Sequence, residues 1–185
     1  GTKPESAMAF AVVSEAAKTV AHWIPATRRT LADAKQLRSY VDTFLRYGLD
    51  EALETQIVQG DGIGENFLGI LNQPGTTAQA WDTNLLTTTR RARTKVRTVG
   101  RAQATAYVLH PTDWESMDLL QDAENRYYFG GPSVLGTPRL WGLPVVESEA
   151  MTVGAGEVAD WRLAMLWDRE ISQILVSDSH ADFFI

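Results

Sequence analysis

The feature that most constrains this chain is a long amphipathic pattern between residues 34 and 59. Apolar side chains recur there at steps of three and four, which places them on one face of an α-helix. The members of this face are Leu37, Tyr40, Val41, Phe44, Leu45, Gly48, Ala52, Leu53 and Ile57. At about 1.5 Å per residue such a helix is ~39 Å long, longer than a small domain is wide. We therefore predict a rigid rod against which other parts of the protein pack.

The ends of this helix carry their own signals. Asp33 followed by Gln36 has the spacing of a capping box, and Gly60 and Gly62 can supply left-handed backbone at the stop. Gly48 lies on the apolar face at a helix-propensity cost of ~1 kcal/mol, so we expect a backbone to pass close to it.

Shorter elements surround the rod. Alternating or continuous apolar stretches predict strands, and apolar residues three or four apart predict helices. The expected elements are a strand within 5–26, a helix over 86–98, a buried strand over 105–109, a short helix from Pro111, one strand over 140–146 with Pro144 marking an edge or a bulge, and a hairpin over 161–167 and 171–176. This order indicates the α+β class.

Length and composition exclude several kinds of protein. With 185 residues, surface scaling predicts a compact domain that exposes roughly 8,900 Å² and buries ~70% of its unfolded surface. The absence of cysteine excludes disulfides, zinc–cysteine sites and thiol nucleophiles. No apolar run reaches ~18 residues, so no membrane contact is expected. Because the chain starts without methionine and ends in an apolar stretch, we expect it to be a piece of a longer polypeptide.

The sequence carries no convincing reaction centre. The glycines at 60–64 lack the lysine and the preceding strand that phosphate loops need. His22, His110 and His180 show no metal-ligand spacing, and the Ser, His and Asp residues at 177–182 are only neighbours in sequence. We therefore predict neither an enzyme nor a cofactor or metal site.

A basic run is the sharpest charge feature. Five cations fall within eight residues: Arg90, Arg91, Arg93, Lys95 and Arg97. They can contact nucleic-acid phosphates, bind an acidic neighbouring chain, or form the solvated face of a helix in a protein whose net charge is −6. The negative net charge argues against a protein that coats nucleic acid.

An aromatic and glycine-rich stretch, residues 125–132, contains Tyr127, Tyr128 and Phe129. Exposed aromatic clusters mark interaction surfaces, so these three residues are candidates for contacts between subunits. The alternative is a loop folded onto its own core.

Several short motifs, in this order, resemble the major capsid proteins of tailed bacteriophages with the Hong Kong 97-type fold. The motifs are Lys3-Pro4-Glu5-Ser6, residues 19–24, Ser39-Tyr40, Tyr47-Gly48-Leu49, Gly60-Asp61-Gly62, residues 110–114, residues 126–132, residues 141–146 and Trp167-Asp168-Arg169. Each motif alone is weak, and the resemblance rests on the ordered set, which covers essentially the whole chain.

The resemblance implies an architecture and a set of partners. Residues 1–16 would be the descending arm of an extended loop, 17–60 the strand and spine helix of a peripheral domain with its own sheet, 61–166 an inserted axial α+β domain, and 167–185 the return strands into the peripheral domain. Copies would form pentamers and hexamers of an icosahedral shell, with scaffold and portal proteins as further partners. The shell would enclose double-stranded DNA with only non-specific contact, in the virion after assembly in the host cytoplasm.

The same resemblance raises one covalent possibility and one alternative function. Lys3 matches the lysine that, in some members of the family, forms an isopeptide cross-link to an asparagine of another subunit. It can equally be an ordinary solvated lysine, because a lysine with a pKa near ~10.4 is protonated at neutral pH and attacks poorly. The alternative functions are an encapsulin-type nanocompartment shell, which shares the fold, and a DNA-binding module that uses the basic run.

Overall fold

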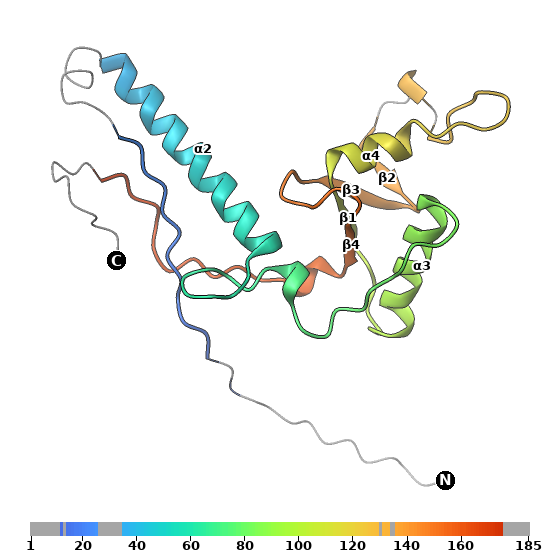
Figure 1. The fold of residues 1–185 in the computed structure, drawn as a ribbon, viewed down its shortest axis with the longest axis horizontal. Coiled ribbons are helices and arrows are strands. Elements are labelled where there is room, and N and C mark those ends of the chain that lie inside the picture. Colours follow the sequence, from blue (N-terminus) through green and yellow to red (C-terminus); the bar gives the residue numbers. More distant parts are fainter. Residues whose placement is uncertain (1–11, 13, 26–34, 130, 134–135, 176–185) are drawn as a thin grey trace, which may run out of the picture.

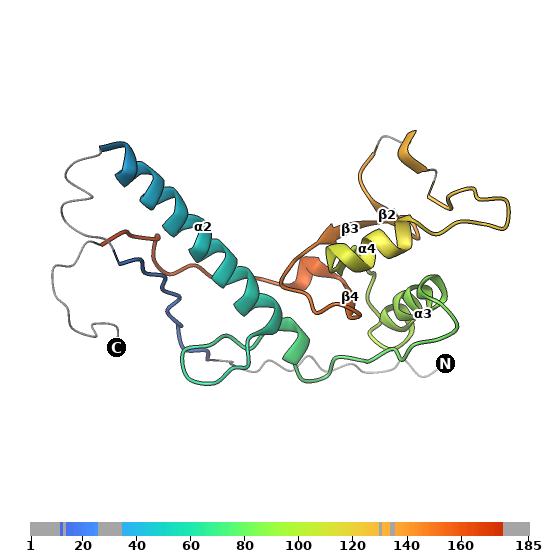
Figure 2. The ribbon, with the colours of Figure 1, turned by 45° about the horizontal axis from the view of Figure 1, so that its top comes forward.

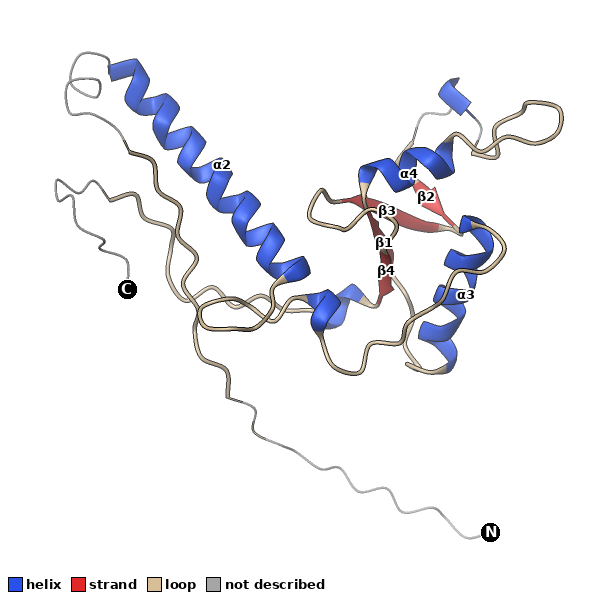
Figure 3. Cartoon of the chain, viewed as in Figure 1, coloured by secondary structure: helices blue, strands red, loops and turns tan. Residues whose placement is uncertain are grey.

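The computed structural model describes residues 12, 14–25, 35–129, 131–133 and 136–175. A long helix and a lobe of short elements lie at opposite sides of the molecule (Figure 1). Figure 3 shows helices and strands mixed along the chain, which confirms the α+β class. The helices are α2 (Lys35–Gln59), α3 (Leu85–Thr98) and α4 (Pro111–Asp118), and the strands are β1 (Ala106–Leu109), β2 (Arg139–Leu140), β3 (Leu143–Glu147) and β4 (Gly156–Ala159).

The lobe, which runs from α3 to β4, is built on a sheet with strand order β2-β3-β1-β4. Strand β1 runs parallel to β3 and antiparallel to β4, and Tyr107 pairs with Val145 on one side and with Val158 on the other. Both α3 and α4 send apolar side chains to the face that carries Tyr107. The buried core consists of Tyr107, Leu109, Trp114, Met117, Leu140 and Val145.

The predicted rod is present as α2, one continuous helix. The Asp33–Gln36 capping box lies outside the side chains that the structure describes. At the other end Gly62 has a φ of 73°, as predicted, whereas Gly60 does not have positive φ. A Cβ at Gly60 would lie 2.2 Å from the carbonyl oxygen of Phe67, so this glycine is required by close backbone approach.

Gly48 is also approached closely, but by a side chain and not by a backbone. A Cβ at this position would lie 2.7 Å from Nε2 of His22. The extended segment over residues 14–25 runs beside α2 in both views (Figures 1 and 2). The glycine therefore gives room to the His22 imidazole, which lies close to the helix backbone.

The stretch over 140–146 is a hairpin and not one interrupted strand. Trp141 and Gly142 have φ values of 53° and 80°. Two positive φ values in succession are typical of the type I′ turns that form two-residue loops between hairpin strands. Pro144 pairs with Arg139, and β3 lies inside the sheet between β1 and β2. The expected edge position of Pro144 was therefore wrong, because the break in the strand comes from the turn.

Two other strand predictions were wrong for the described residues. Residues 14–25 and 164–175 are extended but pair with no strand, and Trp161–Leu163 form a 3-10 turn. The peripheral-domain sheet is consequently absent from the described part of the chain. An alternating apolar pattern predicts a strand only where a neighbouring strand can complete it, and here none is present. Strand β4, by contrast, was not predicted.

The molecule exposes far more surface than a compact domain. Its accessible area is 15135 Å², against roughly 8,900 Å² expected for a compact chain of this mass. The prediction that ~70% of the unfolded surface is buried was therefore wrong, since roughly half is. Much of the α2 face stays exposed, including Tyr40 (67%) and Phe44 (63%).

The last turns of α2 are joined to the loop between β3 and β4. The Ser148 hydroxyl donates to the Glu54 carboxylate, and the Gln59 amide donates to Ala150 O and to Thr152 Oγ1. Val58 is buried at the same place. These contacts form the joint between the rod and the lobe.

Candidate functional site

No metal-ligating cluster of His, Asp or Glu is found among the residues that the structure describes. His110 caps α4, with its Nδ1 accepting a hydrogen bond from the Thr112 N–H at 3.1 Å. His180 and residues 177–182 lie outside the described residues, as does Lys3. The candidate sites that can be examined are therefore surfaces.

Helix α3 divides the basic run into two sets of residues. Arg91 forms an ion pair with Asp82 at 2.5 Å, and the Lys95 ammonium donates to Ala78 O at 2.8 Å. Both cations thus hold the preceding loop onto the helix. The remaining three, Arg90, Arg93 and Arg97, are spaced by three and four and share the other side of α3.

These three arginines line an open groove of about 420 Å³. Its opposite wall is the segment that leads into β1, residues 102–104. Arg97 is exposed, and no ion pair or side-chain hydrogen bond holds it in the described part of the chain. Guanidinium groups exposed in this way can bind an anionic group, either a carboxylate or a phosphate.

Two of the arginines also hold the hairpin turn. The Arg93 guanidinium donates to Trp141 O, and the Arg90 guanidinium lies 6.0 Å from the centre of the Trp141 ring. The Trp141 indole N–H donates to Thr89 Oγ1 at 3.2 Å. Trp141 was missed as an important residue, although the glycine that follows it is a turn signal.

Tyr107 connects the groove to the core. Its hydroxyl donates to Thr89 O at 3.1 Å. Burial raises the pKa of Tyr107 to about 12, although Arg93 and Arg90 act in the opposite direction. The phenol therefore stays neutral and acts as a structural donor at ordinary pH.

The aromatic stretch is divided between the core and the surface. Phe129 packs edge to face on Trp114, with ring centres 5.5 Å apart, whereas Tyr128 is 61% exposed and Tyr127 37%. Only the two tyrosines remain candidates for contacts with another chain, because the Phe129 ring is used inside the lobe.

The loop that carries these tyrosines has a fixed shape. The Asp122 carboxylate accepts the backbone N–H groups of Glu124 and Arg126, both at 2.9 Å, and pairs with the Arg126 guanidinium at 2.8 Å. These donors, led by the Arg126 N–H, hold the pKa of Asp122 below its usual value. The loop is thus formed in advance of any partner.

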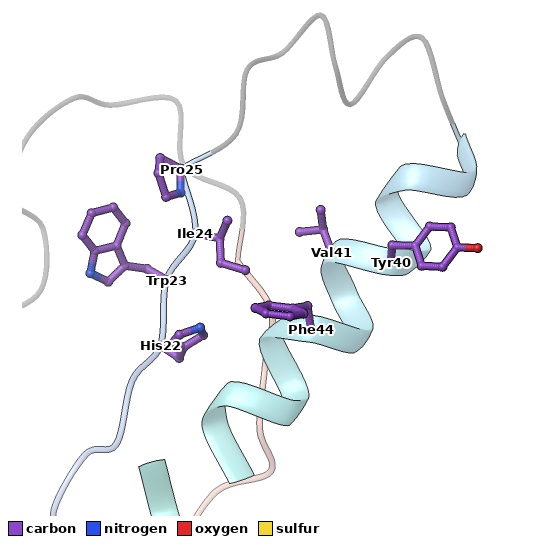
Figure 4. A pocket seen from close by; sticks show the side chains of 7 residues that line it. All are labelled: His22, Trp23, Ile24, Pro25, Tyr40, Val41 and Phe44. Atoms are coloured by element: carbon purple, nitrogen blue, oxygen red, sulfur yellow. The ribbon is translucent and has the colours of Figure 1, made fainter. Parts of the chain in front are cut away.

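An apolar groove of about 460 Å³ lies between residues 22–25 and the first half of α2. Figure 4 shows Ile24 and Phe44 facing each other across it, while Trp23 points away. Trp23 is 69% exposed. The apolar pattern of α2 was recognised in the sequence, but its exposure could not be.

A second apolar surface follows the lobe. Leu163, at the end of the 3-10 turn, and Met165, Trp167 and Ile171 in the extended segment that follows are between 73% and 85% exposed. Monomeric proteins seldom leave contiguous apolar side chains of this size in water. Among the described residues, no helix combines the length and the apolar composition that crossing a bilayer requires.

Comparison with known proteins places the chain in a family. The sequence model of the Phage capsid family matches residues 1–185. The chain is 37% identical over 193 residues to the major capsid protein of Enterobacteria phage HK97, covering 99% of this chain and 48% of that protein. It thus spans about half the length of the curated relative that it matches.

One solved structure is also similar, the capsid of a native GTA particle computed with C5 symmetry. It shares 20% sequence identity, with a TM-score of 0.44, over 69% of this chain and 49% of the other. The family match over the full length and the identity to the HK97 protein confirm the resemblance carried by the sequence motifs, and the chain belongs to the phage capsid family.

Proposed function

We propose that this chain is part of a major capsid protein whose copies assemble into an icosahedral shell around double-stranded DNA. The observation that carries the proposal, beside family membership, is the exposed apolar surface on α2 and on residues 163–175. Covering such side chains with other protein removes apolar surface from water and so lowers the free energy of the system. Family membership also supports a structural role and not an enzymatic one.

The division of the chain follows the family resemblance. We assign 1–16 to the descending arm of an extended loop, 17–60 to the peripheral strand and spine helix, 61–166 to the axial domain, and 167–185 to the return into the peripheral domain. The separation of α2 from the lobe in Figure 2 agrees with a boundary near residue 60. The peripheral sheet would then be completed by strands that the described residues do not supply.

The partners follow from the same proposal. Copies of the chain would meet in pentamers and hexamers through Arg90, Arg93 and Arg97, through Tyr127 and Tyr128, and through the apolar surfaces. Arg91 and Lys95 would act indirectly, because they hold the 78–82 loop. Scaffold and portal proteins would act during assembly in the host cytoplasm, and the finished shell would be part of the virion.

Two alternatives are less well supported. The family and the curated relative are both described as capsid proteins, which favours a capsid over an encapsulin-type nanocompartment. A dedicated DNA-binding module would need its cations free, whereas two of the five bind the protein's own loop.

The test is expression of the full-length protein followed by electron microscopy. We expect hollow polyhedral particles, and a protein that stays monomeric at high concentration would contradict the proposal. Nucleic acid inside the particles, as opposed to protein cargo, would separate a capsid from a nanocompartment.

Lys3 is proposed as a cross-link donor in mature particles. A denaturing gel would then show a ladder of covalent multimers, and Lys3→Arg would abolish it while particles still form. A gel that contains only monomer bands would remove this role.

A further inference from the structure

The lobe carries its positive and its negative charges on different segments of the sequence. Six cations and no carboxylate lie between residues 90 and 101, whereas no Lys or Arg lies within 102–125 or 140–161. Those two stretches carry the carboxylates Asp113, Glu115, Asp118, Asp122, Glu124, Glu147, Glu149, Glu157 and Asp160.

The basic groove and the start of α4 lie at the two ends of β1. Asp160 is an exception among the carboxylates, because it follows Ala159, which pairs with Ala106 at the basic end, and it forms an ion pair with Arg162. The arginine groove is lined by residues 102–104, which lead into the strand. Helix α4 starts at Pro111, just after the strand ends, and Glu147 pairs with Leu109 at the same end. With a rise of about 3.3 Å per residue, the four residues of β1 separate these ends by ~13 Å. In Figure 1, α4 lies at the top of the lobe and α3 at its right-hand side.

Charged side chains on both α3 and α4 are exposed and available to a partner. Arg97 and Arg90 are exposed, and the guanidinium of Arg90 reaches only Thr94 and the Trp141 ring. Glu115 and Asp118 are exposed, and no ion pair involves either of them in the described part of the chain. Asp113 is different, because its carboxylate accepts the Gly154 N–H at 2.8 Å.

We propose that the groove formed by Arg90, Arg93 and Arg97 in one copy binds the carboxylates of Glu115 and Asp118 in the next copy. This inference rests on the proposed self-assembly. The two carboxylates are three residues apart on α4, and Arg90 and Arg93 are three apart on α3, so both pairs present charges at a similar spacing. Each guanidinium can bind one carboxylate through two parallel N–H···O bonds.

The geometry of such a contact is head to tail. The basic surface and the acidic surface are different parts of the same molecule, so the contact is heterologous, and a rotation that closes produces a ring. The attraction would set the order and the register of copies in the ring, while apolar contacts supply most of the free energy.

The experiment is a charge exchange in the full-length protein. Arg97→Glu and Glu115→Arg are made separately and together, and ring and particle formation is followed by native mass spectrometry and electron microscopy at several salt concentrations. Each single variant should raise the concentration needed for assembly about tenfold, as expected for a close interfacial charge pair. The double variant should recover to within about threefold of the wild type, because it restores the pair with its sign reversed.

Arg46→Glu is the matched control. Arg46 is an exposed residue of α2, and the substitution changes the net charge by the same amount. Assembly should be nearly unaffected by it. If Arg46→Glu weakens assembly as much as Arg97→Glu, the effect is one of net charge and the inference is overturned.

The remaining outcomes separate this inference from the proposed function. Particles that form equally well from all variants would overturn the contact and leave the capsid proposal intact, whereas a wild-type protein that forms no particles would contradict the capsid proposal itself. Loss of packaged DNA with Arg97→Glu, without rescue by Glu115→Arg, would assign the groove to phosphate. If Arg97→Glu does not fold, a cycle with Arg97→Gln and Glu115→Gln should still show non-additive effects, and additive effects would overturn the contact.

Discussion

Gly60 and Gly69 bring two backbones together where α2 ends. The Gly69 N–H donates to Gly60 O at 2.8 Å, and a Cβ on Gly69 would lie 2.4 Å from the Gly60 nitrogen. Asn72 adds to the same contact, since its amide donates to the carbonyl oxygens of Gln59 and Gly60. Because glycine has no side chain, the loop can return at Gly69 to pack directly on the end of α2.

Gly60→Ala is expected to destabilise the protein. The new methyl group would meet the backbone oxygens of Phe67 and Gln56, which cannot rotate away as a side chain can. Overpacking of this kind costs about 1–3 kcal/mol. Chemical denaturation would measure the loss, and Gly136→Ala, where nothing lies within 4 Å of the added Cβ, should leave stability unchanged within about 0.5 kcal/mol.

Glu157 places a carboxylate in a partly buried position on β4, opposite Val108. Burial raises the pKa of Glu157 above its usual value. A raised folded-state pKa means that the favourable contribution of the protonated form is present at low pH and is lost as the pH rises through that pKa. The ionised side chain consequently weakens the lobe at neutral pH.

Replacing Glu157 by glutamine should therefore raise the melting temperature at pH 7. The advantage over the wild type should shrink as the pH falls through the raised pKa of Glu157, because the glutamate then takes up its proton. Thermal melts over a pH series would measure this, with Glu149→Gln, an exposed position, as the comparison. A gain that is constant with pH would show that the charge of Glu157 is not the cause.

At the scale of elements, the hairpin β2–β3 and helix α3 hold each other. Trp141 has a left-handed backbone, with a φ of 53°, which is unfavourable for a large side chain but well suited to asparagine before glycine. Its indole and carbonyl groups are nevertheless both bonded to α3. The contacts with α3 therefore compensate for the unfavourable left-handed backbone of Trp141.

Trp141→Asn tests which of the two effects is larger. We expect a net loss of about 1–2 kcal/mol, because the substitution improves the turn but removes the indole contacts with Thr89 and Arg90. Hydrogen exchange along α3 should accelerate as the helix loosens. A stabilised variant would show that the strain of the turn dominates, and Trp81→Asn, at an exposed loop position, controls for the loss of an aromatic residue.

Elements whose pattern is local could be predicted from the sequence, whereas elements that depend on a partner could not. Helices α2 and α3 and strand β1 follow from local periodicity, which needs no knowledge of partners. The alternating stretch over 161–167 did not form a strand, because alternation describes a surface that some other strand must complete. Strand β4 was missed because Gly156-Glu157-Val158-Ala159 is too short and too mixed to show a pattern.

The candidate site was predictable to a similar degree. The basic run and the aromatic stretch were both recognised in the sequence. Which of their residues bind within the protein and which stay exposed was not. Arg91 and Lys95 are held by Asp82 and Ala78, and Phe129 by Trp114, so their roles depend on residues distant in sequence or on a loop whose path could not be foreseen. Spacing alone separates Arg90, Arg93 and Arg97 from the other two, and this signal was present.

For the molecule as a whole, the exposure of α2 means that a substitution there can affect the proposed assembly without affecting folding. Phe44 is 63% exposed and lines the apolar groove, so Phe44→Ser removes little buried area from a single copy. We expect the melting temperature of unassembled subunits to change by no more than about 3 °C, while the yield of particles in electron microscopy falls at least about fivefold.

Thr43→Ser is the control for Phe44→Ser. Thr43 is an exposed neighbour on α2, and its hydroxyl bonds back to Ser39 O, which serine can also do. Particle yield should stay near that of the wild type. An equal loss of particles in both variants would point to the helix itself and not to its apolar face.

A small rotation at the joint between α2 and the lobe produces a large displacement at the far end of the helix. Glu54 and Gln59 are held at one end of a helix that is ~37 Å long, so a turn of roughly 5° at the joint moves the far tip by roughly 3 Å. In a closed shell built from copies of this chain, the same displacement would occur in every copy. A few polar contacts around Ser148 would thus help to decide how sharply that shell bends, and hence its final diameter.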